Sequence, residues 1–215
     1  RVFLAGATGY IGRHVVRELA RRGHEVVAFA RPRAGPRGRW DEAEIQRELS
    51  GAEVRFGQVT SARDLAEAGF RGESFDAVVS CLASRTGEPE DAWAIEHRAN
   101  LALLEAAQTA GAHHFVLLSA ICVQKPRLAF QHAKLAFEGA LQRSGMAYSI
   151  VRPTAFFKSL AGQIARVKRG RPFLLFGDGE RTACKPISEA DLSRYIADCL
   201  DDPDKRNAIL PVGGP

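Results

Sequence analysis

Short apolar runs alternate with amphipathic stretches along most of the chain. The apolar runs predict buried strands at Val2–Ala5, Glu25–Ala30, Glu53–Phe56, Phe75–Cys81, His114–Ser119 and Ala147–Val151. Between the strands, apolar residues recur at three- and four-residue spacing, which predicts helices at Ile11–Arg22, Asp41–Leu49, Ala62–Ala68, Pro89–Ala110 and Ala129–Ser144. These helices are predicted to end at Gly23, Gly51, Gly69, Gly111 and Gly145. The alternation indicates an α/β fold, a Rossmann-like doubly wound parallel sheet covered on both faces.

The rhythm changes after the sixth predicted strand. There the pattern predicts helices at Phe157–Lys168 and Glu189–Leu200, short apolar stretches at Pro172–Phe176 and Cys184–Ile187, and a last strand at Asn207–Val212. We therefore expect a nucleotide-binding Rossmann domain at residues 1–152 and the start of a small C-terminal substrate-binding region, packed on the sheet, at residues 153–215. Because the chain starts inside a strand and ends directly after an apolar stretch, we expect it to be a truncated piece of a longer protein.

Composition excludes several classes of protein. A hydrophobic content of 46% is too high for intrinsic disorder, and no apolar run is long enough for a transmembrane segment. The 30 Lys and Arg residues exceed the 25 Asp and Glu residues, but the two signs are interleaved along the chain, so we do not expect nucleic-acid binding. The four cysteines include no C-x-x-C pair and the six histidines include no H-E-x-x-H motif, so we expect no metal site.

The most specific short motif follows the first predicted strand and opens the first predicted helix. It reads GATGYIGR, and it supplies the candidate cofactor-binding residues Gly6, Thr8, Gly9, Tyr10, Ile11, Gly12 and Arg13. The first glycine permits a tight turn, the second lets the backbone approach a pyrophosphate, and the third lets helix and strand pack closely. The motif predicts a dinucleotide site at the N-terminus of the helix.

The second predicted strand ends in Arg31, where NAD-binding proteins usually carry an acidic residue for the ribose 2′-hydroxyl. A cation there suits a 2′-phosphate, and Arg13 is placed to close on the same group, so we predict NADP(H) as cofactor. The alternative is that both arginines are solvated loop cations. By topology, Cys81, Leu82 and Ala83 at the end of the fourth strand should pass beside the adenosine and ribose, and Pro153 should border the nicotinamide.

The glycine motif resembles that of the atypical branch of the short-chain dehydrogenase/reductase superfamily. Later blocks narrow the resemblance to the divinyl chlorophyllide 8-vinyl reductases; they are LLSAICVQKP at 117–126, FQHAK at 130–134, YSIVRPTAFFKSL at 148–160, FGDG at 176–179 and ACKPIS at 183–188. The resemblance covers most of the chain. It implies NADPH-dependent reduction of the 8-vinyl group of a divinyl chlorophyllide or protochlorophyllide to ethyl, in chlorophyll or bacteriochlorophyll biosynthesis. It also implies a tetrapyrrole substrate and, at most, a peripheral place at photosynthetic membranes.

The candidate catalytic residues are Lys134, Phe130 and Ser119. Ordinary short-chain dehydrogenases place a Tyr four residues before this Lys, whereas this chain has Phe130, which cannot protonate a carbonyl oxygen. We expect Lys134 to orient the nicotinamide ribose and to supply positive charge near the transferred hydride, and Phe130 to offer an aromatic surface to a flat substrate. Ser119, at the carboxyl end of the fifth strand, is a candidate polar contact to substrate or nicotinamide, or else forms an ordinary strand-end hydrogen bond.

Three other functions compete with this interpretation. One is an NADPH-dependent reductase of another conjugated substrate on the same scaffold. A second is a non-catalytic NADP(H) sensor, because the missing Tyr is also what an inactive enzyme would show. A third, an NDP-sugar epimerase, is disfavoured because its chemistry generally needs that Tyr. We expect a bacterial protein of this kind in the cytoplasm, and a eukaryotic one in the plastid.

Overall fold

The computed structural model describes residues 1–174, 178 and 185–214, and it contains a parallel sheet of seven strands. The strands run in the order β3-β2-β1-β4-β5-β6-β7, as in doubly wound dinucleotide-binding folds, which confirms the predicted fold class. Their bounds are β1 Val2–Ala5, β2 Val26–Ala30, β3 Glu53–Phe56, β4 Ala77–Ser80, β5 His114–Leu118, β6 Ala147–Pro153 and β7 Ala208–Val212. Of the FGDG block at 176–179, only Asp178 is among the described residues, and the predicted apolar stretches Pro172–Phe176 and Cys184–Ile187 are described only at 172–174 and 185–187.

The helices match the predicted ones except where the chain forms wider π-helical turns. The α-helices are α1 Gly12–Arg21, α2 Glu42–Glu48, α3 Ala62–Asp64, α4 Pro89–Ala92, α5 Asn100–Thr109, α6 Ala129–Arg143, α7 Phe157–Lys168 and α8 Glu189–Asp201. The π-helices are η2 Leu65–Phe70 and η3 Trp93–Ala99, and short 3₁₀ turns occur at Pro36–Gly38, Ile121–Gln124 and Pro203–Lys205.

One predicted helix end is wrong. Gly69 lies inside η2, and the chain turns two residues later, where Arg71 and Gly72 adopt the left-handed conformation with φ of 55° and 69°. The other predicted stops, Gly23, Gly51, Gly111 and Gly145, all have positive φ. Gly69 stays in the helix because its missing Cβ leaves room for Phe3 and Phe29, which a Cβ there would contact at 3.3 and 3.4 Å.

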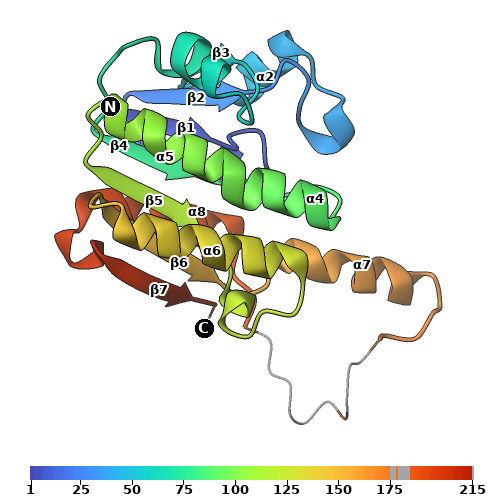
Figure 1. Ribbon diagram of the computed structural model, residues 1–215. Helices are drawn as coiled ribbons and strands as arrows, with labels where there is room; N and C mark the ends of the chain where they lie inside the picture. The colour runs from blue at the N-terminus through green and yellow to red at the C-terminus, as the bar shows by residue number, and fades with distance from the viewer. Residues whose placement is uncertain (175–177, 179–184, 215) are drawn as a thin grey trace.

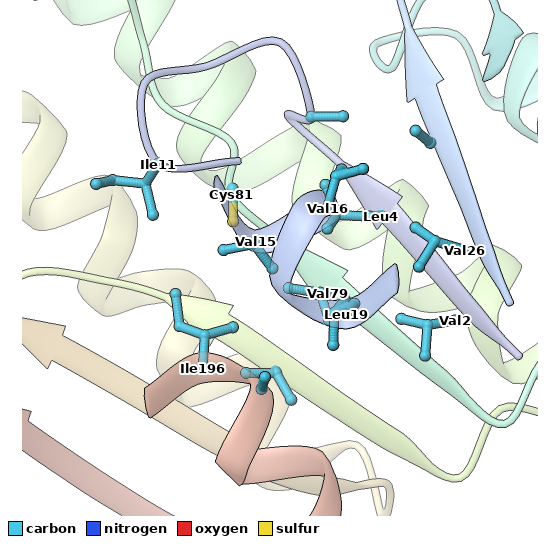
Figure 2. Packing of buried hydrophobic residues seen from close by; sticks show 14 of the residues in the cluster. Val2, Leu4, Ile11, Val15, Val16, Leu19, Val26, Val79, Cys81 and Ile196 are labelled. Atoms are coloured by element: carbon cyan, nitrogen blue, oxygen red, sulfur yellow. The ribbon is translucent and has the colours of Figure 1, made fainter. Parts of the chain in front are cut away.

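Alternate residues of β1 face opposite layers of the fold. Val2 and Leu4 belong to a core cluster with α1, α2 and α8, whereas Phe3 and Ala5 belong to a second cluster with η2, α5 and α6. Figure 1 shows α5 and α6 in front of the sheet and α8 behind it. Figure 2 shows the first cluster, in which the α1 side chains Val15, Val16 and Leu19 and the α8 side chain Ile196 pack against the strands. The sheet is therefore a rigid platform buried on both sides.

Residues beyond 152 contribute both to the sheet and to a projecting helix. β7 pairs in parallel with β6, and α8 packs against α1. In contrast, α7 extends away from the sheet (Figure 1), and none of its residues is buried. The boundary proposed at residue 152 stays a prediction. No helix among residues 1–174 and 185–214 combines the length and hydropathy that a membrane span requires.

Candidate functional site

The glycine turn between β1 and α1 has the close contacts that its sequence predicts. Gly6 has a φ of 82°, and a Cβ on it would lie 2.5 Å from the backbone of Cys81. A Cβ on Gly12 would lie 2.1 Å from the Gly6 carbonyl oxygen, so only glycine lets α1 begin this close to β1. No side chain caps the start of α1 at Ile11, and no acidic residue lies in its first turn. The helix N-terminus can therefore receive a phosphate.

A pocket of about 380 Å³ opens beside this turn, at the carboxyl ends of the strands. Of the predicted cofactor-binding residues, those that line it are Gly6, Thr8, Gly9, Tyr10, Arg13, Arg31, Cys81, Leu82 and Ala83. The others lie elsewhere. Ile11 packs into the core, Gly12 is buried behind the turn, and Pro153 ends β6 in a buried position. Lys134 does not line the pocket, and its ammonium is paired with Glu96.

Three arginines line the pocket. Arg31 and Arg85 both line it, and the Arg85 guanidinium donates a hydrogen bond to the Gly35 carbonyl oxygen at 3.2 Å. Burial, and after it the positive charge of Arg85, lower the pKa of Arg31. Arg13 also lines the pocket, and its buried Nε has no hydrogen-bond partner. The Asp91 carboxylate lines the same pocket, but among the described residues no carboxylate lies within ion-pair distance of these three guanidinium groups, so the arginines suit an anion.

Tyr10 ties the glycine turn to the C-terminal helix. Its hydroxyl donates to Glu189 Oε2 at 2.7 Å, at the start of α8. Burial, together with this hydrogen bond and the charge of Glu189, raises the pKa of Tyr10 to about 12. The Lys158 ammonium, which also lines the pocket, lies 4.4 Å from the centre of the Tyr10 ring. The turn is thus held from the side of α7 and α8.

Lys134 is buried and paired, although its sequence pattern does not indicate a partner. Its Nζ lies 2.6 Å from Glu96 Oε2 and donates to the Leu118 carbonyl oxygen at 3.3 Å. Glu96 also accepts a hydrogen bond from the Ser84 backbone N–H, and Ser84 directly follows the wall residues Cys81–Ala83, so the ion pair lies beside the pocket wall. Since the pair with Glu96 is neutral overall, the geometry supports an orienting role for Lys134 more than a source of net positive charge.

Ser119 and Phe130 do not line the pocket. Ser119 is buried, and its hydroxyl donates to Glu138 of α6, which also forms a buried ion pair with Arg152 of β6. The structure therefore shows the strand-end hydrogen bond at Ser119. Phe130 is half-buried in the first turn of α6, one helical turn before Lys134. The substrate-facing roles of Ser119 and Phe130 stay predictions.

Sequence reasoning missed Arg85, Glu96 and Lys158. The signal for Arg85 is its place shortly after the fourth strand, whose carboxyl end is predicted to border the cofactor. Arg85 lines the pocket together with Arg31. Glu96 stands four residues before Asn100, a spacing that places both on one helix face. Lys158 carried no signal, because its approach depends on how α7 leaves the sheet.

The residues present fit a dinucleotide phosphate. Three features favour an anionic ligand. At Gly6 the backbone leaves a space that a Cβ would fill, the start of α1 has no side-chain cap, and the buried Arg13 Nε has no hydrogen-bond partner. Gln58 lines the same pocket, and its backbone N–H donates to Asp64 at 2.8 Å. Within the described part of the chain, no cluster of His, Cys, Asp and Glu could hold a metal ion.

Curated relatives match the whole chain. It is 56% identical over 219 residues to a chloroplastic divinyl chlorophyllide a 8-vinyl-reductase of Oryza sativa subsp. indica, and 54% identical over 220 residues to one of Zea mays. All of this chain is covered in both cases, but only 54% and 55% of the relatives, so the chain spans about half their length. The identity confirms the resemblance that the sequence blocks indicate.

Solved structures and a family model agree on the fold. Pal from Bacillus thuringiensis superimposes with a TM-score of 0.80 at 18% identity, covering 99% of this chain and 77% of that protein. The model of a family described as NAD(P)H-binding matches residues 6–203, which include the glycine turn, the pocket wall and α8. The match extends over most of the chain, so this chain belongs to the NAD(P)H-binding family.

Proposed function

We propose that this chain is the NADP(H)-binding part of an oxidoreductase that reduces the 8-vinyl group of divinyl chlorophyllide or divinyl protochlorophyllide to ethyl. The observation that carries the proposal is the identity of 56% over the whole chain to the rice reductase. The pocket adds independent support, since it combines a glycine turn at a helix N-terminus with three arginines whose guanidinium groups have no carboxylate within ion-pair distance among the described residues. NADPH supplies the hydride in such a reaction.

The chain's own residues divide the work between the two ends of the pocket. Arg31, Arg85 and Arg13 supply positive charge for a 2′-phosphate, which NADPH carries and NADH lacks. At the other end, Lys134 orients the ribose through a hydrogen bond from its ammonium. The absence of a Tyr at position 130 fits reduction of a carbon–carbon double bond, which has no carbonyl oxygen to protonate.

The proposed cellular location rests on the same two relatives. Both are chloroplastic, which supports a plastid location for this chain if it is eukaryotic. In a bacterium, the same reaction would take place in the cytoplasm. With photosynthetic membranes, we propose at most a peripheral contact. The described residues contain no helix that could span a membrane.

The test is direct product analysis. Full-length protein is incubated with NADPH and divinyl chlorophyllide, and the pigments are separated by chromatography. We expect the monovinyl product to appear only when protein and NADPH are both present. If NADPH binds and no monovinyl product forms, with oxygen or without it, the proposal is wrong and the sensor interpretation is favoured.

A further inference from the structure

Glu96 is a buried carboxylate that belongs neither to the glycine turn nor to the pocket wall. Its side chain is 2% exposed, and its Oε1 accepts hydrogen bonds from the Ser84 backbone N–H at 2.9 Å and the Ser84 hydroxyl at 3.2 Å. Ser84 directly follows the wall residues Cys81–Ala83. Glu96 therefore joins the segment after β4 to the helix that covers it.

The backbone around Glu96 is built to hold it in place. Glu96 lies in η3, and π-helical turns within helices occur frequently at functional sites. The Asn100 side-chain amide donates to the carbonyl oxygens of Ile95 at 3.3 Å and Glu96 at 3.0 Å, and it accepts from the Ser80 hydroxyl at 2.6 Å. The π-turn is thus fastened to the end of β4, at the carboxyl edge of the sheet where dinucleotides bind.

Among the described residues, the cationic partner of this carboxylate is Lys134, and both side chains are less than one-tenth exposed. An isolated buried charge costs several kcal/mol, so each group needs the other. An ammonium has three donor hydrogens. Within the described residues, the Leu118 carbonyl oxygen accepts one of them, and Glu96 Oε2 lies 2.6 Å from Nζ as an ion pair without hydrogen-bond geometry, so a donor hydrogen remains for a ligand.

We propose that Glu96 is a positioning residue that holds the Lys134 ammonium against the pocket wall, so that its remaining donor meets a hydroxyl of the nicotinamide ribose. The inference rests on the proposed cofactor and extends it to a residue outside the pocket lining. It also assigns the two halves of the ligand to different groups. The adenosine 2′-phosphate depends on the arginines, whereas the nicotinamide ribose depends on the Glu96–Lys134 pair.

The test compares two probes that share the adenosine half. NADPH has the nicotinamide ribose, and 2′,5′-ADP lacks it. In Glu96→Gln, we expect the Kd of NADPH to rise about tenfold, while the Kd of 2′,5′-ADP stays within about twofold of the parent value. Glu96→Asp keeps a carboxylate and should recover most of the NADPH affinity. The matched control is Glu105→Gln, an exposed Glu on α5 of the same continuous helix, which should alter neither Kd.

The outcomes separate the pair from the fold and from the reaction. The proposal is overturned if Glu96→Gln binds NADPH as the parent does, or if both probes weaken equally together with a lower Tm, because that pattern would mark a purely structural role. Binding is measured without turnover. A parent protein that binds NADPH but makes no monovinyl product would therefore contradict the proposed reaction and leave the Glu96 comparison fully interpretable.

Discussion

The arginines of the pocket lining and the buried Lys134–Glu96 pair differ in how their positive charge is compensated. At one end, Arg31, Arg85 and Arg13 have no carboxylate within ion-pair distance among the described residues. Outside the pocket lining, the Lys134 ammonium lies 2.6 Å from Glu96 and is shielded from solvent. A cation without a carboxylate partner can form a strong ion pair with an anionic ligand. A cation that already has a carboxylate partner can only donate a hydrogen bond to a ligand. The difference indicates which part of a ligand each end receives.

The largest expected effect comes from removing the paired cation. Lys134→Ala should lower kcat by roughly a hundredfold, because a preorganised donor at the reacting end is lost. Steady-state turnover of divinyl chlorophyllide measures it. Since the change leaves Glu96 buried without its cation, the double variant Lys134→Ala, Glu96→Gln serves as control. Turnover within a few-fold of the parent in either variant would remove Lys134 from the mechanism.

Reversing the charge at the unpaired end should give the next largest effect. Arg31→Glu should raise KM for NADPH by about tenfold to a hundredfold, since a charge-assisted hydrogen bond is worth about 1.5–3 kcal/mol, and should change KM for NADH much less. The matched control is Arg33→Glu, an exposed arginine two residues later that does not line the pocket. Equal effects on both cofactors would show that Arg31 does not recognise the 2′-phosphate.

A smaller effect is expected at the second cation. Arg85→Gln removes one positive charge and the hydrogen bond to Gly35, but it leaves Arg31 in place and relieves the repulsion between the two guanidinium groups. The Kd of NADPH should rise by about fivefold, with that of NADH unchanged, as measured by nucleotide fluorescence titration. An NADPH affinity equal to that of Arg33→Gln, the matched control, would exclude Arg85 from the phosphate site.

The smallest effect concerns the glycine turn between the two ends. Tyr10→Phe removes the hydrogen bond to Glu189 and should lower the free energy of unfolding by about 1 kcal/mol. The folded-state pKa of Tyr10 is about 12, above its ordinary 10.0, so its contribution is fully present below pH 10.0 and is lost as pH rises through 12. Denaturant unfolding at several alkaline pH values should show a shallower decline in Tyr10→Phe. An unchanged decline would contradict this assignment.

The phosphate end could be predicted from the sequence, and most of the other end could not. The glycine motif and Arg31 are adjacent in the chain to strand ends, so topology alone places them. Glu96 and Lys134 are far apart in sequence, and they meet only because η3 and α6 pack together. The π-helical turns have no sequence signal distinct from an α-helix, and the sequence therefore predicts a helix end at Gly69, which lies inside η2. Ser119 was placed at the correct strand edge, but its partner Glu138 depends on α6 packing.

The most direct test of the account is the affinity of the unaltered chain for the two reduced cofactors. Isothermal titration with NADPH and with NADH, at the same ionic strength, measures what the three unpaired arginines contribute to binding the 2′-phosphate. We predict that NADPH binds at least about tenfold more tightly than NADH. Equal affinities, or tighter binding of NADH, would contradict the assignment of this end of the pocket to a 2′-phosphate.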